Sequence, residues 1–138
     1  MSKPEKGMNV PEDLLYTEDH EWIRVTDGNT GICGITDHAQ NALGDIVFVE
    51  FPANIVNSTV EKRGTVAVVE SPKAVSDVYS PAAGKILVIN EALEETPEII
   101  NSDPYGEGWM FKLEISDMSS LDLLLKPAEY LRLIKEGV

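Results

Sequence analysis

The sequence contains few of the residues that carry out catalysis or hold metal ions. Its 138 residues include two histidines and one cysteine. A single cysteine, Cys33, excludes an internal disulfide and a zinc site built from several thiolates, and we expect it to be a small buried apolar residue. His20 and His38 stand apart in the sequence without metal-ligand spacing. We expect both to be surface or capping residues and expect no metal site.

Common catalytic motifs are missing too. The chain has no phosphate-binding GxxxxGK[ST] loop, no GxGxxG dinucleotide fingerprint, no HExxH and no GxSxG. With so few nucleophiles and general bases, we do not expect a free-standing enzyme.

Basic residues are scarce: 11 Lys and Arg stand against 24 Asp and Glu, for a formal net charge of −13. A nucleic-acid binder needs clustered Lys and Arg to replace the counterions of the phosphates. An anionic membrane surface attracts basic segments in the same way. The charge therefore predicts that neither nucleic acid nor a membrane is a partner.

Long apolar runs are absent as well. No stretch approaches the roughly 18 apolar residues of a membrane-spanning helix. The first residues, MSKPEKG, have no apolar segment and no arginine, so they resemble neither a secretory signal nor a transit peptide. We expect a cytoplasmic protein; the alternative that stays open is a mature organellar protein without its presequence.

What is present is enough apolar sequence, 43%, for one folded domain. Residues 1–13 are polar and contain Pro4, Gly7 and Pro11, so we expect a loose N-terminal arm. Residues 14–138 form the predicted single domain.

Short segments of alternating or β-branched character dominate this domain and predict strands. They are 22–25, 30–35, 45–51, 65–70, 75–79, 85–90 and 109–115. In 45–51 five of the six residues from Ile46 to Phe51 are apolar, which predicts a strand covered on nearly both sides. Closely spaced strands of this kind predict a mainly β sandwich or barrel.

Helix signals are fewer. Thr36 or Asp37 can cap a helix that ends at Gly44, and residues 96–101 predict about one helical turn. At the C-terminus, Ser119 or Ser120 can cap 121–125, and Pro127 opens a second helix. We therefore expect a C-terminal helical segment at about 119–136.

The most distinctive segment is Glu70-Ser71-Pro72-Lys73-Ala74 between two predicted strands. Proline fixes φ for the second position of a β-turn, and lysine rather than glycine in the third position favours type I. This places Lys73 at the tip of a hairpin. On these residues alone, Lys73 is either an ordinary solvated turn lysine or an amine presented to a modifying enzyme.

Several segments together resemble the glycine cleavage system H proteins, over roughly residues 14–135. In chain order they are His20–Trp22, Gly34–Gln40, Leu43–Glu50, Val69–Pro81 and Asp103–Trp109. The resemblance implies a lipoyl/biotinyl-type β-sandwich, or barrel-sandwich hybrid, with short helices. It also implies a carrier: lipoate would be attached covalently to Lys73 and would supply the chemistry.

In such a system a pyridoxal-phosphate glycine decarboxylase loads an aminomethyl group onto the lipoyl arm. A tetrahydrofolate-dependent aminomethyltransferase removes it, and a dihydrolipoyl dehydrogenase reoxidises the dithiol. A lipoylating enzyme is the fourth partner, and we expect a monomer. The resemblance places the receiving cleft at Asp19, His20 and Glu21 and at Asp77, where the Glu21 and Asp77 carboxylates would hold the protonated amine.

The sequence departs from the family pattern in two places. Pro72 stands where a typical member has valine, and the segment 52–59 lacks an expected glycine. Three alternatives stay open. The first is a biotin carrier, which is disfavoured because Pro72 and Ala74 rather than methionines flank the lysine. The second is an H-like lipoyl relay or a carrier serving another lipoate-dependent pathway, and the third is a binding module that is no longer modified.

Overall fold

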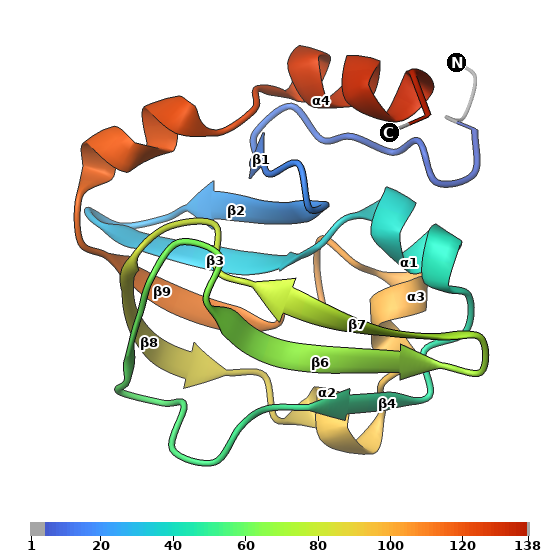
Figure 1. Cartoon of the computed structure of the whole chain (residues 1–138), viewed down its shortest axis with the longest axis horizontal. Coiled ribbons are helices and arrows are strands. Elements are labelled where there is room, and N and C mark those ends of the chain that lie inside the picture. Colours follow the sequence, from blue (N-terminus) through green and yellow to red (C-terminus); the bar gives the residue numbers. More distant parts are fainter. Residues whose placement is uncertain (1–4, 138) are drawn as a thin grey trace.

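The computed structural model describes residues 5–137, which fold into two antiparallel sheets with short helices around them (Figure 1). One sheet has six strands in the order β1-β2-β3-β9-β8-β5, and the other has three in the order β4-β6-β7. The strands are β1 (Leu15–Tyr16), β2 (Glu21–Val25), β3 (Thr30–Ile35), β4 (Phe48–Glu50), β5 (Thr59–Val60), β6 (Thr65–Ser71), β7 (Ala74–Tyr79), β8 (Gly84–Ile89) and β9 (Phe111–Ile115).

The helices are short, and most lie where capping residues predict them. They are α1 (Asp37–Leu43), α2 (Ala92–Glu95), α3 (Ile99–Ser102), the 3₁₀ helix η1 (Met118–Leu123) and α4 (Pro127–Lys135). The side chain of Thr36 accepts a hydrogen bond from the N–H of Ala39, and Gly44 ends α1 with a φ of 83°. Asp117, rather than the expected Ser119 or Ser120, caps η1.

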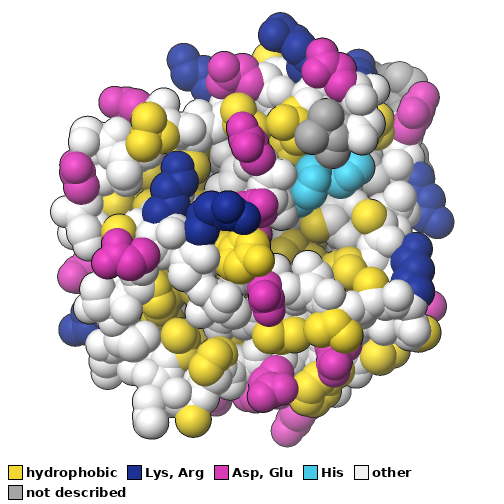
Figure 2. Space-filling view, in the orientation of Figure 1, with side chains coloured by type: hydrophobic (Ala, Val, Ile, Leu, Met, Phe, Trp, Pro, Cys, Tyr) yellow, Lys and Arg dark blue, Asp and Glu magenta, His cyan; other side chains and the backbone are white. Residues whose placement is uncertain are grey.

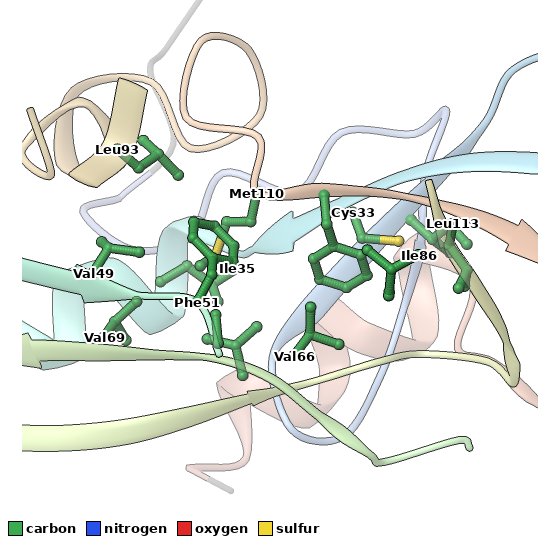
Figure 3. Packing of buried hydrophobic residues seen from close by; sticks show 14 of the residues in the cluster. Cys33, Ile35, Val49, Phe51, Val66, Val69, Ile86, Leu93, Met110 and Leu113 are labelled. Atoms are coloured by element: carbon green, nitrogen blue, oxygen red, sulfur yellow. The ribbon is translucent and has the colours of Figure 1, made fainter. Parts of the chain in front are cut away.

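The main core lies between the two sheets. Side chains from β3, β8 and β9 point toward those from β4 and β6, as Figure 3 shows for Cys33, Ile86, Leu113, Val49 and Val69. Cys33 is fully buried, as predicted. This arrangement gives the three-stranded sheet one buried face and one face open to solvent.

The prediction for residues 45–51 is wrong in two respects. Only Phe48–Glu50 forms a strand, and the segment is not covered on both sides. Val49 is 1% exposed, whereas Val47 and Phe48 are 57% and 44% exposed. The reason is that β4 is an edge strand of a sheet with one open face, so an apolar side chain on that face meets water.

The β6–β7 hairpin closes through the two residues Pro72 and Lys73, because Ser71 pairs with Ala74. Two-residue hairpins favour turns with positive φ, but proline cannot adopt it. Lys73 is not among the residues with positive φ either, which agrees with the predicted type I turn. A turn of this kind is stiff at its first central residue.

A second apolar cluster joins the C-terminal helix to the other face of β1 and β2. Trp22, Tyr16 and Tyr130 are fully buried there, and the rings of Tyr16 and Tyr130 stack at 4.5 Å. Strand β2 is therefore covered on both faces, with Ile23 in the main core and Trp22 against α4. This double covering also determines the surroundings of the neighbouring Glu21.

Residues 5–13 contain no helix or strand, but they lie against the domain. Met8 and Val10 pack on the second cluster, and the backbone N–H of Asn9 donates to Asp37 Oδ2 at 3.1 Å. The Tyr105 hydroxyl donates to the carbonyl of Asn9 at 2.6 Å. These contacts hold the segment in place; the division into an arm and one domain stays a prediction.

The loop without the expected glycine uses asparagine instead. Asn54 and Asn57 have φ values of 64° and 70°. Asparagine tolerates this left-handed region better than other residues with a side chain. The second departure from the family pattern is therefore compatible with the turn that the loop needs.

Candidate functional site

Lys73 is exposed and lies in the turn of the β6–β7 hairpin, whose tip projects at one end of the domain (Figure 1). A Cβ added at Gly44 would lie 3.6 Å from Lys73 Cε, so the lysine stem rests beside the C-terminal end of α1. Neither of the two ion pairs found within residues 5–137 involves Lys73. The structure therefore presents this amine without a carboxylate competing for it.

Glu21 is the most deeply buried carboxyl group of the predicted site, at 2% exposure. The Thr17 hydroxyl donates to Glu21 Oε1 at 2.6 Å, and the N–H of Tyr79 donates to Oε2 at 3.4 Å. Burial raises the pKa of Glu21 to about 7, against the lowering effect of these hydrogen bonds. Near neutral pH the group can therefore exchange a proton.

The raised pKa of Glu21 predicts a pH-dependent stability. The folded carboxyl has a pKa of about 7, above its ordinary value of 4.5, so the unfolded chain releases this proton first as pH rises. The contribution of Glu21 to the free energy of unfolding is fully present below about pH 4 and is lost as pH rises through the folded pKa. Between pH 5 and 8.5 the free energy of unfolding should fall by on the order of 2 kcal/mol. Urea unfolding of Glu21→Gln is expected to lack this part of the fall.

Glu18→Gln is the matched control, because Glu18 is exposed and its substitution removes the same charge. It should keep the pH dependence of the unaltered chain. Equal pH dependence of Glu21→Gln and the unaltered chain would show that Glu21 titrates normally.

Asp19 lies at the surface beside Glu21 and is bound by Arg63. The guanidinium contacts Asp19 through Nε at 2.9 Å and Nη2 at 3.3 Å, and it lies 5.1 Å above the ring of Tyr79. Arg63 precedes β6 and Tyr79 ends β7, whereas Asp19 comes just before β2. Through its contacts with Asp19 and Tyr79, Arg63 thus links the two sheets next to Glu21.

A cavity of about 250 Å³ adjoins these groups. Glu21, Asp19 and Arg63 contribute polar atoms to it, and Tyr16 and Leu124 contribute apolar surface. Sequence reasoning missed Arg63, Tyr79 and Thr17, since only the fold brings them to Glu21.

His20 has a φ of 69° and is held by the C-terminal helix. Its Nδ1 is 2.8 Å from the Tyr130 hydroxyl, which in turn is 2.7 Å from Thr36 Oγ1. The ring of His38 lies 4.5 Å from that of His20, and Figure 2 shows the two histidines together at the rim of a hollow on this face. The pKa of His20 is lowered, first by burial and second by His38.

Asp77 lies exposed on the outer face of β7, and no hydrogen bond or ion pair joins its carboxylate to Glu21 among the described residues. Asp77 is two residues before Tyr79, whose backbone N–H donates a hydrogen bond to Glu21. The structure therefore brings Asp19, His20 and Glu21 together with the far end of β7, and places Asp77 between that group and Lys73.

Two further findings concern the described part of the chain. None of its helices has the length and apolar character to cross a membrane. No three His, Cys, Asp or Glu side chains within residues 5–137 come together as a metal site would require.

The comparisons with known proteins agree with this geometry. A family model described as "Glycine cleavage H-protein" matches residues 14–137. The chain belongs to the glycine cleavage H-protein family. Among its relatives, the glycine cleavage system H protein of Carboxydothermus hydrogenoformans is 52% identical over 127 residues, covering 92% of this chain and 95% of that protein. One from Thermus thermophilus is 54% identical over 123 residues, covering 89% and 94%.

A solved glycine cleavage system H protein, from Mycobacterium marinum, has the same fold. It superposes with a TM-score of 0.77 at 37% identity, covering 94% of this chain and 100% of that one. These matches confirm the predicted family, the lipoyl-domain β-sandwich and the shuttle role in glycine cleavage. This H-family chain is a carrier component of that system.

Proposed function

We propose that this H-family chain carries lipoate in amide linkage on Lys73 and is itself non-catalytic. The observation that carries the proposal is the exposed Lys73 amine at the tip of a stiff hairpin, beside Gly44 and without an ion-pair partner among the described residues. The group would supply a dithiolane that bears the transferred aminomethyl unit and exchanges electrons. The chain's own residues supply its position and its protection from water.

The residues present fit such an arm. A lysine extended by a lipoyl chain has about a dozen bonds and reaches on the order of 10–15 Å. A strand rises about 3.3 Å per residue, so Asp77 lies about 13 Å along β7 from Lys73. An arm laid along β7 therefore ends near Asp77, with Glu21 next to the strand beyond it.

Glu21 and Asp77 would hold the cargo amine. An ammonium group next to Glu21 favours the charged carboxylate, so cargo binding would release the proton that Glu21 holds near pH 7, where its pKa lies. Arg63 and Asp19, which join the two sheets at this point, would limit the entry of water.

The proposed partners are a pyridoxal-phosphate glycine decarboxylase, a tetrahydrofolate-dependent aminomethyltransferase, a dihydrolipoyl dehydrogenase and a lipoylating enzyme. We propose that the protein works as a monomer in the cytoplasm, because successive enzymes must reach one hairpin. An acidic surface supports fast association with partners of opposite charge.

Intact mass and peptide mapping of protein purified from its native host test the attachment. A lipoyl adduct on Lys73 is the expected result. An unmodified Lys73 in cells supplied with lipoate would overturn the proposal. Protein from an overexpressing host is unsuitable, because modification there can lag behind synthesis.

The cleft is tested by the double substitution Glu21→Gln and Asp77→Asn. We expect the loaded protein to lose its cargo about tenfold faster, since two charge-assisted hydrogen bonds to the amine are weakened. Release of formaldehyde and ammonia from purified loaded protein measures the rate.

Glu50→Gln with Glu70→Gln is the matched control. It also removes two charges, both from the three-stranded sheet that holds Asp77, at positions without a predicted contact to the cargo. If the cleft variant and this control release cargo at the same rate as the unaltered protein, the assignment of Glu21 and Asp77 fails.

A further inference from the structure

The open face of the three-stranded sheet carries a regular mixture of side chains beside Lys73. Directly opposed residues of an antiparallel sheet project from the same face. Apolar and acidic residues alternate along and across the strands in two rows, Phe48–Glu70–Val75 near the turn and Glu50–Val68–Asp77 behind it. We call these six residues the checkerboard surface.

Half of this surface is apolar, yet its four residues on β4 and β7 are exposed, and Val68 and Glu70 on β6 are half-buried. Phe48 is 44% exposed and Val75 is 66% exposed, whereas Val49 and Val69 on the opposite face are each 1% exposed. The two rows contain three carboxylates and no basic residue. Figure 2 shows hydrophobic and acidic side chains side by side over the region of β4, β6 and β7.

We propose that the checkerboard surface is the docking site of the enzyme that attaches lipoate to Lys73. This inference rests on the proposed lipoylation. The enzyme presents an apolar patch that covers Phe48 and Val75, with Lys or Arg side chains around it that pair with the carboxylates. Such a partner removes exposed apolar surface from water and is complementary in charge.

The length of the lysine side chain explains why this partner needs the hairpin itself. Unmodified Nζ extends only about 6 Å from Cα, so the modifying enzyme must bring its reacting groups to the turn. The other partner enzymes react with the far end of the lipoyl arm, about 10–15 Å from the turn. Their active sites can therefore lie farther from the hairpin strands. The opposite face of the sheet is closed by the core, which leaves the checkerboard surface as the accessible side.

The test uses a purified lipoate–protein ligase, lipoate, MgATP and the unmodified full-length chain. The lipoyl carboxyl displaces pyrophosphate from ATP, and Nζ then displaces AMP, which keeps the lost carboxyl oxygen. The Lys73 ammonium gives up two of its three protons to solvent and keeps one as the amide N–H. Intact mass measures the rate. Phe48→Thr with Val75→Thr is expected to lower kcat/KM by about tenfold or more, mainly through KM.

Val88→Thr is the matched control, because Val88 is also 44% exposed but lies on β8 in the other sheet. Its kcat/KM should stay within twofold of the unaltered chain. Urea unfolding of each variant verifies that the sheet is intact.

A competition experiment separates docking from chemistry. Lys73→Arg cannot be acylated but keeps the checkerboard surface, so it should inhibit modification of the unaltered chain with a Ki close to that chain's KM. Lys73→Arg combined with Phe48→Thr and Val75→Thr should inhibit about tenfold less.

The outcomes distinguish the two proposals. If the unaltered chain is never acylated at Lys73, the proposed function fails and the inference fails with it. If the unaltered chain is acylated but the Phe48/Val75 variant reacts and competes equally well, only the docking surface is overturned.

Discussion

Lys73→Arg is expected to reduce glycine–bicarbonate exchange to the level measured without the protein. Arginine keeps the positive charge and most of the length, but its guanidinium stays protonated and does not form the amide. Without the proposed lipoyl arm on Lys73, the protein would have no group to take cargo from the proposed decarboxylase. Exchange of labelled bicarbonate into glycine, with purified partner enzymes, measures the effect.

The substitution should leave the fold unchanged, because Lys73 is exposed and has no ion-pair partner in the described structure. Its free energy of unfolding is expected to stay within about 0.5 kcal/mol of the unaltered chain. Lys85→Arg, at an exposed lysine on β8, makes the same chemical change elsewhere and should retain full exchange. Full exchange in Lys73→Arg would contradict the assignment.

Gly84→Ala is expected to cause the largest loss of stability among single-methyl changes. Gly84 begins β8 and lies between Val60 of β5 and Ile115 of β9. An added Cβ would overlap the backbone carbonyl oxygen of Glu114, which cannot rotate away as a side chain could. The strands must separate locally, at a cost of about 3 kcal/mol or more, measured by urea unfolding.

Gly28→Ala provides the control for backbone conformation. Gly28 has a φ of +55°, and nothing lies within 4 Å of the added methyl group. Its substitution should cost only about 1 kcal/mol, the penalty of a left-handed residue with a side chain. Equal losses at the two glycines would mean that crowding at Glu114 is not the cause.

Much of the β architecture can be predicted because its strands carry their own pattern. The pattern in 30–35 predicts the bounds that β3 has, and the predicted strands around the lysine hairpin differ from β6 and β7 by one residue at most. The short strands β1 and β5 and the helix α2 are not predicted. Two-residue strands are too short to show alternation, so only their pairing with β2 and β8 reveals them.

Lys73 can be located from sequence because a turn is a local structure. Glu21 is named through the family resemblance, but its burial cannot be predicted. An acidic residue next to Trp22 normally faces water, and here it is covered because both faces of β2 are packed.

The contacts of His20 cannot be predicted from the neighbouring sequence either, because they also depend on the tertiary packing. Its partner Tyr130 lies 110 residues away in the sequence, and only the docking of α4 brings the two together. Neither histidine shows a pattern that points to the other, although their rings lie 4.5 Å apart.

The position of β9 in the larger sheet has a consequence for biogenesis. This strand is residues 111–115, and it lies between β3 and β8. Thr30 of β3 pairs with Glu114 of β9, so all the residues between them form a loop that this pairing must close. Closing so long a loop slows folding relative to local pairings. Ribosomes add about 5–20 residues per second, so β6 and β7 emerge seconds before the sheet beneath them can be completed. The hairpin can form early, but the larger sheet on which it packs is complete only after residues 111–115 have been synthesised.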